Sequence, residues 1–401
     1  MARHIKALIR FRGGPITLAE YMSEVLTNPT AGYYMHRDVF GGQGDFTTSP
    51  EVSQLFGEMV GIWCLTVWQQ LGQPRKLRLV ELGPGRGTLM ADLLRGTAVF
   101  QQFAKAVHVD LVEVSTAMRD LQWGTLRCEE RLLGDVGPSL LGQDPHPTAV
   151  SAISGAQVRW HHSLDEVPSD APAIYLAHEF FDALPVHQFQ RTERGWCERL
   201  VDLASPDSPL HLRLVLSPGP TPASQLLVER RLSSLPAGTE SRSQLEVSPQ
   251  GMATAAELSQ RVAQHGGAAL IVDYGQEGPY AASLQAIRSH KFVSLLEQPG
   301  KADLSARVDF GALRSAAEGR GAEVACHGLI TQAQFLQSLG IQARLESLLQ
   351  RASPPEAEML QQGYMRLVGG KGRTSADEEG MGESYKALAI TCRDADIPVA
   401  F

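Results

Sequence analysis

One short segment restricts the fold of this chain more than any other, the run Leu79-Val-Glu-Leu-Gly-Pro-Gly-Arg-Gly-Thr-Leu89. Its pattern predicts an apolar strand over 77–82, a glycine-rich turn, and a helix over 88–95. Such a turn needs glycines because a Cβ would block close approach of the backbone to a ligand. The helix that follows directs its first backbone N–H groups and a partial positive charge at the same space. The segment therefore predicts a ligand-binding turn at the end of a buried strand.

Short apolar runs elsewhere in the chain predict further strands of a sheet. They span 107–114, 173–177 and 268–274, and helical segments separate them. Runs of this length, bounded by turns, indicate parallel strands that are covered on both faces. Residues 385–391 could return to the sheet as a last strand. We therefore expect an α/β fold with a Rossmann-like, mostly parallel, seven-stranded sheet.

The spacing of the glycines separates one class of nucleotide site from another. The motif is E-x-G-x-G-x-G, formed by Glu81, Gly83, Gly85 and Gly87. A dinucleotide site would have its third glycine at Thr88, and a P-loop would need G-x-x-x-x-G-K-[ST], which the chain lacks. The motif present is the first motif of class I methyltransferases, which bind S-adenosylmethionine (SAM). Because SAM carries a sulfonium cation and no phosphate, an acid at Glu81 suits it.

The second predicted strand also ends in a carboxylate, Glu113. In nucleotide-binding folds an acidic residue at this place accepts hydrogen bonds from the ribose hydroxyls. The order of these features is a strand, the glycine motif, a helix, a second strand and a terminal acid, and this order favours a SAM site. The alternative is a tight glycine turn without a ligand, beside a solvated acid.

The third predicted strand leads into the segment Leu176-Ala-His-Glu-Phe-Phe-Asp-Ala-Leu-Pro-Val186, which contains one histidine and two carboxylates. Ligands of doubly wound sheets lie beyond the carboxyl ends of the strands. The candidate catalytic residues there are His178, Glu179 and Asp182, whose two carboxylates could hold a cationic substrate. The alternative is a helix N-terminus whose acids stabilise the helix dipole.

The chain before the glycine motif is expected to be helical, with glycine-rich interruptions. Thr17 and Glu20 have the spacing of a capping box, a loop is expected over 40–50, and a second helix over 51–71. The predicted organisation is an N-terminal helical region with a cofactor-covering loop, 1–75, and a methyltransferase core, 76–401. An insertion is expected around 201–250 and a flexible segment at 369–383.

The first 14 residues contain five basic or histidine side chains and no acid. That composition is typical of a transit peptide, but the segment is short and lacks a secretory cleavage pattern. The alternative, an amphipathic first helix with Ile5, Leu8 and Ile9 on one face, is favoured.

Composition excludes several classes of function. The net charge of -8 argues against nonspecific nucleic-acid binding, which needs clustered basic residues. The five cysteines are widely separated and form no CxxC, so we expect reduced thiols and no metal site. No apolar run approaches the length of a membrane span.

Several stretches resemble the MidA-like family of mitochondrial complex I assembly methyltransferases, and they are most similar to its animal members. They cover most of the chain in the family's order, at 13–34, 44–58, 79–95, 111–115, 175–189, 266–275 and 299–310. The family has a class I methyltransferase sheet with an added N-terminal helical region. The resemblance implies symmetric dimethylation of an arginine on an iron–sulfur-cluster subunit of respiratory complex I in the mitochondrial matrix.

The resemblance also extends the set of expected site residues. The cofactor-binding residues are expected to be Glu81, Gly83, Pro84, Gly85, Gly87 and Glu113. The segment 44–51 is expected to fold over SAM with Asp45, Thr48 and Ser49 as contacts. Glu179 and Asp182, together with His178, would face the substrate.

Two other hypotheses remain open at this point. The chain could be a methyltransferase-like scaffold for complex I assembly that lacks catalysis, although such a scaffold has no physical need for three glycines in the turn. It could be an NAD-dependent oxidoreductase, against which Thr88 counts.

Overall fold

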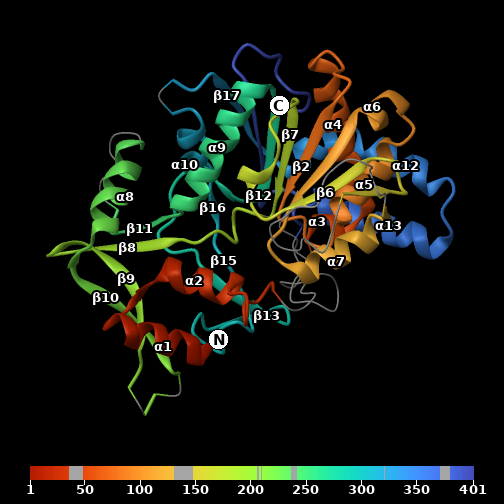
Figure 1. The fold of residues 1–401 in the computed structure, drawn as a ribbon. Coiled ribbons are helices and arrows are strands. Elements are labelled where there is room, and N and C mark those ends of the chain that lie inside the picture. The colour runs from red at the N-terminus through yellow and green to blue at the C-terminus, as the bar shows by residue number, and fades with distance from the viewer. Residues whose placement is uncertain are drawn as a thin grey trace. The chain divides into compact units, whose positions relative to one another are not determined.

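The computed structural model describes residues 1–35, 48–130, 148–205, 207–208, 210–235, 242–319, 321–370 and 380–401 (Figure 1). The chain forms two compact units. Unit 1 comprises Met1–Phe46, Phe180–Glu257 and Tyr274–Arg320, and unit 2 comprises Thr47–Glu179, Leu258–Asp273 and Gly321–Phe401. The chain therefore passes between the units several times.

A largely parallel sheet forms the centre of unit 2, in the order β17-β18-β12-β7-β2-β3-β6-β5-β4. Its strands are β2 (Leu77–Leu82), β3 (Val107–Val112), β4 (Cys128–Glu130), β5 (Ala149–Ser151), β6 (Gln157–His161), β7 (Ala173–His178), β12 (Gly267–Gln276), β17 (Val324–Thr331) and β18 (Tyr385–Cys392). The neighbours from β12 to β6 are paired in parallel, whereas β17 with β18 and β5 with its neighbours are antiparallel. The expected class I sheet is confirmed, and the short strands β5 and β4 extend it at one edge.

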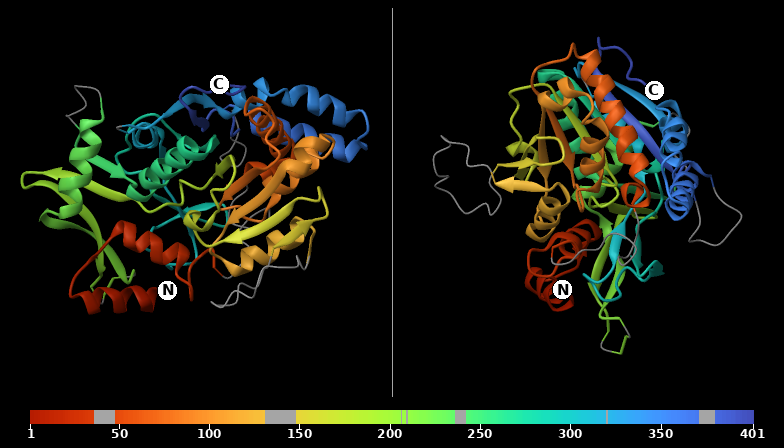
Figure 2. Two further views of the ribbon diagram at one scale, coloured as in Figure 1. Left: turned by 45° about the horizontal axis from the view of Figure 1, so that its top comes forward. Right: turned by 90° about the vertical axis from the view of Figure 1, so that its right-hand side faces the viewer.

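Helices cover this sheet on both sides (Figure 2). They are α3 (Ser49–Val52), α4 (Gln54–Gln70), α5 (Thr88–Thr97), α6 (Gln101–Ala106), α7 (Thr116–Thr125), the end of α9 (Pro249–His265), α11 (Gln332–Ser338), α12 (Ile341–Leu349) and α13 (Pro354–Val368), with a 3-10 turn, η1, at Leu164–Glu166. All six residues of β2 are buried. A strand with no exposed face is largely apolar, which explains why the sequence shows runs and not alternation. The two charged residues of β2 are exceptions: Arg78 is paired with Asp110, and Glu81 belongs to the site described below.

The helix predicted over 51–71 is wrong at its start. Ser53 is extended, with φ of -163°, and divides the segment into α3 and α4. Its hydroxyl accepts a hydrogen bond from the backbone N–H of Leu55, so it caps α4. Helix α4 buries residues around most of its circumference, including Phe56, Trp63 and Trp68, and forms part of the main hydrophobic core.

Unit 1 is built on antiparallel strands. One sheet has the order β1-β9-β8-β11 with β10 beside β9, and a second has the order β14-β13-β15. The elements are α1 (Ala2–Arg12), β1 (Ile16–Thr17), α2 (Leu18–Thr27), β8 (His187–Thr192), β9 (Gly195–Leu203), β10 (Leu212–Pro220), α8 (Pro222–Ser233), β11 (Gln244–Val247), β13 (Gln285–Arg288), β14 (Lys291–Val293), β15 (Asp303–Ser305), β16 (Val308–Asp309) and α10 (Phe310–Ala317). Strand β16 pairs with Gly275 and Gln276 at the end of β12.

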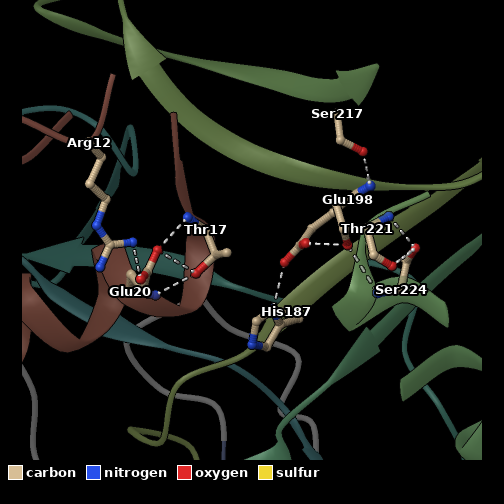
Figure 3. A network of polar contacts seen from close by, with 8 residues as sticks. All are labelled: Arg12, Thr17, Glu20, His187, Glu198, Ser217, Thr221 and Ser224. Atoms are coloured by element: carbon tan, nitrogen blue, oxygen red, sulfur yellow. Dashed lines mark hydrogen bonds and ion pairs between the residues drawn. The ribbon is translucent and has the colours of Figure 1, made fainter. Parts of the chain in front are cut away.

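Both N-terminal helices form where the sequence predicts them, and they belong to unit 1. Helix α1 buries Ile5 and Ile9, and the capping box of Thr17 and Glu20 begins α2 (Figure 3). The same figure shows Glu198, whose buried carboxylate lies 2.6 Å from His187 Nδ1 and accepts a hydrogen bond of 2.6 Å from the Thr221 hydroxyl. These contacts tie β8, β9 and the start of α8 together.

The expected domain boundary at residue 75 stays a prediction. The compact units divide the chain at other places, because α4 belongs to the core of unit 2 while α1 and α2 belong to unit 1. The segment 369–383 lies mostly outside the described residues. Within the described residues, no helix is long and apolar enough to cross a membrane, and no three metal-ligating side chains gather in one place.

Candidate cofactor and active site

The glycine turn after β2 has the conformation that its sequence predicts. Gly83, Gly85 and Gly87 have φ of 61°, 53° and 83°, in the left-handed region that a residue with a Cβ rarely adopts. The N–H of Gly83 donates to the carbonyl of Val112, and the N–H of Gly87 donates to the carbonyl of Pro84 at 2.8 Å. Gly87 then serves as the N-cap of α5. At these three positions the turn therefore presents backbone without a side chain, at the end of the central strand.

Glu81, one residue before the end of β2, is fully buried. Burial raises the pKa of its carboxyl to about 8. Its Oε2 has no hydrogen-bond partner among the described residues. A buried oxygen without a partner is costly unless a ligand or a proton compensates it. The ammonium or sulfonium of SAM is a suitable partner, so this residue fits the cofactor expected from the sequence.

Glu113 lies beside the glycine turn, and Gln122 of α7 joins the two. The Nε2 of Gln122 donates to the carbonyl of Gly85 at 2.7 Å and to Glu113 Oε2 at 3.2 Å. Glu113 Oε1 accepts from the backbone N–H of Ser115 at 2.8 Å. Burial raises the pKa of the Glu113 carboxyl, and these hydrogen bonds oppose the rise. The predicted convergence of the turn and this carboxylate is present.

Helix α3 carries the described part of the segment that was expected to cover the cofactor. Asp45 lies outside the described residues, while Thr48 is 8% exposed and Ser49 is fully buried. Glu51, also in α3, accepts hydrogen bonds from the Thr88 hydroxyl and from Arg86 Nη1. The end of the covering segment is thereby attached to the glycine turn and to the first residue of α5.

His178 and Glu179 lie at the end of β7. Register places Glu81 opposite Leu176, so Glu81 and His178 project from the same face of the sheet. The His178 ring packs on Phe56 with centroids 4.7 Å apart, and burial lowers its pKa to about 3. Its Nε2 is 3.3 Å from Glu179 Oε1 without hydrogen-bonding geometry. The imidazole is therefore neutral beside the carboxylate.

Glu179 has an unusual backbone conformation, with φ of +48°. A non-glycine residue in the left-handed region is strained, and such strain is concentrated at functional sites. Its Oε1 accepts a hydrogen bond of 3.2 Å from the backbone N–H of Ser49. This hydrogen bond joins Ser49, an expected cofactor contact, to Glu179, which is expected to face the substrate.

Asp182 belongs to unit 1, where its carbonyl accepts a hydrogen bond from the N–H of Ala306. Its negative charge also helps to raise the pKa of the Tyr34 hydroxyl. Its expected role as a partner of Glu179 stays a prediction.

Sequence reasoning missed three polar residues of the site, Gln122, Glu51 and Gln332. Gln332 accepts a hydrogen bond from the Ser49 hydroxyl. Glu51 stands within the matched segment 44–58 and could have been included on that ground. The two glutamines have no local signal, because a glutamine in a helical pattern is typical of a solvated face.

Comparison with known proteins agrees with this geometry. The family described as "Putative S-adenosyl-L-methionine-dependent methyltransferase" matches residues 59–328. "Protein arginine methyltransferase NDUFAF7, mitochondrial" of Rattus norvegicus is 43% identical over 97% of this chain and 84% of the relative. Its Homo sapiens counterpart is 42% identical over 97% and 83%.

A solved structure from Burkholderia thailandensis, with bound S-adenosyl-homocysteine, superposes with a TM-score of 0.75 at 25% identity, over 100% of this chain and 94% of the other. The demethylated cofactor in that relative and the match to the family lead to one conclusion. The chain belongs to the MidA-like family of SAM-dependent methyltransferases.

Proposed function

We propose that this methyltransferase acts on arginine side chains of a protein, with the Glu179 carboxylate as the group that binds the guanidinium. The observation that carries the proposal is this carboxylate, whose side chain is 9% exposed and which is held on a strained backbone at the carboxyl end of β7. The relatives named as mitochondrial protein arginine methyltransferases support it. The finer proposal is symmetric dimethylation of an iron–sulfur-cluster subunit of complex I in the mitochondrial matrix.

In the cofactor half of the site, each group has a separate role. When bound, SAM supplies the electrophilic methyl group. The glycine turn allows close approach of the backbone, Glu113 accepts hydrogen bonds from the ribose, and Glu81 balances positive charge. We assign Thr48 and Ser49 to the cover over this half, with Asp45 as a further predicted contact.

The substrate half must make a guanidinium nucleophilic. A guanidinium reacts poorly because its lone pairs are delocalised and its pKa exceeds about 12. A carboxylate that binds it through two N–H groups orients one nitrogen and localises the positive charge. Good alignment of this kind is worth several kcal/mol. We assign this role to Glu179, with Asp182 as its proposed partner or as the eventual acceptor of the proton that the methylated nitrogen loses. His178 is the neutral neighbour of Glu179.

The decisive test is Glu179→Gln, which keeps the shape of the side chain and removes its charge. We expect methyl transfer to be abolished while the dissociation constant of SAM changes by no more than a few-fold. Transfer is measured by mass spectrometry of complex I subunits after incubation with the protein and isotopically labelled SAM. Glu129→Gln, which changes an exposed carboxylate on β4, is the matched control.

Full activity of Glu179→Gln would remove Glu179 from the mechanism. A wild-type protein that binds SAM but labels no subunit would favour the alternative function, a scaffold for complex I assembly without catalysis.

A further inference from the structure

Helix α3 is the point at which three separate parts of unit 2 meet. Glu51 binds Thr88 and Arg86 beside the glycine turn, and Ser49 N–H binds the carboxylate of Glu179. Helix α3 is only four residues long. A single turn of helix is not stable by itself, so its position must come from what packs against it.

The third part is the C-terminal helical segment that follows β17. In α13, a Cβ at Gly363 would lie 2.8 Å from Ser53 Cβ and 3.2 Å from the Val52 carbonyl oxygen. Glycine therefore allows the backbone of α13 to approach the end of α3. Gln332, the first residue of α11, is fully buried against the other end.

The hydrogen bonds of Gln332 have only one consistent direction. The Leu367 carbonyl, 3.0 Å away, can only accept, so the amide nitrogen of Gln332 must face it. The amide oxygen then faces the Ser49 hydroxyl at 3.2 Å, and that hydroxyl must donate. Met381 Sδ lies 3.7 Å from the same hydroxyl. Ser49 is thus fixed from its side-chain end by one buried amide.

We propose that Gln332 is a positioning residue for methyl transfer, which acts through Ser49 to orient the Glu179 carboxylate. The path is short: Gln332 fixes the Ser49 hydroxyl, and the backbone N–H of the same serine holds Glu179 Oε1. Gln332 touches neither cofactor nor substrate in this role. The inference rests on the proposed function of Glu179, and it gives the C-terminal helices a part in the chemistry.

Two substitutions test the path from its two ends. Gln332→Met keeps the length of the side chain and removes both hydrogen bonds, and Ser49→Ala removes the hydroxyl while it keeps the N–H. We expect each to lower kcat for labelled-methyl transfer to complex I subunits by about 5- to 50-fold. For Gln332→Met, which touches neither cofactor nor substrate, KM for SAM should stay within about 2-fold of the wild-type value. The double variant is expected to be no slower than the slower single variant, because both substitutions break the same Ser49–Gln332 hydrogen bond.

Hydrogen exchange gives a readout that does not depend on activity. In both variants we expect the amides of Ser49, Glu51 and Val52 to exchange at least about 5-fold faster, because α3 loses a fixed end. The amides of β2 are expected to exchange at the wild-type rate. The matched control is Gln337→Met, an exposed position of the same helix, which is expected to behave as wild type.

The outcomes separate the two hypotheses. Unchanged kcat and exchange in both variants, with Glu179→Gln inactive, would overturn the role of Gln332 and leave the proposed function intact. An effect of Ser49→Ala without one of Gln332→Met would also overturn it, as would equal losses in Gln337→Met. If Gln332→Met does not fold, Ser49→Ala decides. A fully active Glu179→Gln would overturn both ideas together.

Discussion

At the scale of single residues, three carboxylates at the ends of neighbouring strands have different surroundings and so different tasks. Glu81 Oε2 has no partner among the described side and main chains, Glu113 accepts from Ser115 and Gln122, and Glu179 accepts from Ser49. Hydrogen-bond donors favour the anionic form of a carboxylate, and burial without donors favours the protonated form. Of the three, Glu81 is therefore the group whose charge should respond most to a bound cation.

The first prediction concerns the proton of Glu81. Because the pKa of its carboxyl is about 8 in the folded protein and 4.5 ordinarily, the folded protein keeps a proton that the unfolded chain releases. Stability of the free protein should therefore fall as pH rises from about 4.5 towards 8. Bound SAM should expel this proton near pH 7, so affinity should increase with pH over the upper part of that range.

Calorimetry of SAM binding in buffers of different ionisation enthalpy measures the number of protons released. Glu81→Gln should release fewer protons than the wild type at pH 7. Equal release by the two proteins would show that Glu81 does not titrate on binding.

The second prediction concerns Glu113. Glu113→Ala should weaken SAM binding by roughly 1–3 kcal/mol, as expected for a charge-assisted hydrogen-bonding group. The measurement is isothermal titration calorimetry, with Glu129→Ala, an exposed position on the edge strand β4, as the control. Unchanged affinity would refute the assignment of Glu113 to the ribose.

At the scale of elements, the site is formed by the segments that follow the carboxyl ends of three parallel strands, β2, β3 and β7. The glycine turn, the turn after β3 and the segment after β7 all begin where a parallel strand leaves the sheet. Adjacent parallel strands end at the same edge, so residues far apart in the chain arrive at one place. Helix α7 then holds two of these turns together, because Gln122 binds both the Gly85 carbonyl and Glu113.

The third prediction concerns the backbone of the glycine turn. Gly87→Ala should destabilise the protein by about 1–2 kcal/mol, the cost of a Cβ in the left-handed region. The new Cβ would also lie 3.4 Å from Gln122 Cα and Cγ, so SAM affinity should fall as well. Thermal denaturation measures the loss of stability, and calorimetry of SAM binding measures the loss of affinity.

Gly124→Ala is the matched control for this substitution. Gly124 lies in α7, and an added Cβ there meets nothing within 4 Å. Alanine in a helix is favoured over glycine by about 1 kcal/mol, so this variant should be at least as stable as the wild type. Equal destabilisation by both substitutions would contradict the strain argument.

At the scale of the whole molecule, each compact unit is assembled from three separate pieces of chain. The core of unit 1 combines Ile5, Leu18 and Tyr21 from its first piece of chain with Val201 from the second and Leu304 from the third. Strand β1 of the first piece pairs with β9 of the second, with Ile16 opposite Val201. Neither unit is therefore a contiguous segment that can be excised.

The fourth prediction follows from this interleaving. A fragment of residues 76–401 should not fold cooperatively, because it lacks α1, α2 and β1 from unit 1 and α4 from the core of unit 2. Circular dichroism on heating should show no sharp transition, and SAM should produce no thermal shift. A fragment that folds and binds SAM would instead support an independent domain beginning near residue 76.

Local chemistry determined much of this protein without reference to the rest of the chain. Apolar runs, left-handed glycines and the capping box at Thr17 are properties of neighbouring residues, so the sequence predicts β2, the turn and α2 correctly. Carboxylates at strand ends are equally visible, so Glu81, Glu113 and Glu179 could be selected. The strands β4 and β5 were not predicted, because a segment of three residues is too short to show a hydrophobic period.

Only the tertiary structure decided which polar residues complete the site. Gln122 reaches Gly85 across 37 positions, and Gln332 reaches Ser49 across 283. Nothing in the local sequence marks a glutamine that will be buried, because its burial depends on a partner that folding brings to it. The strained backbone of Glu179 is likewise invisible in the sequence, since the surrounding packing imposes it.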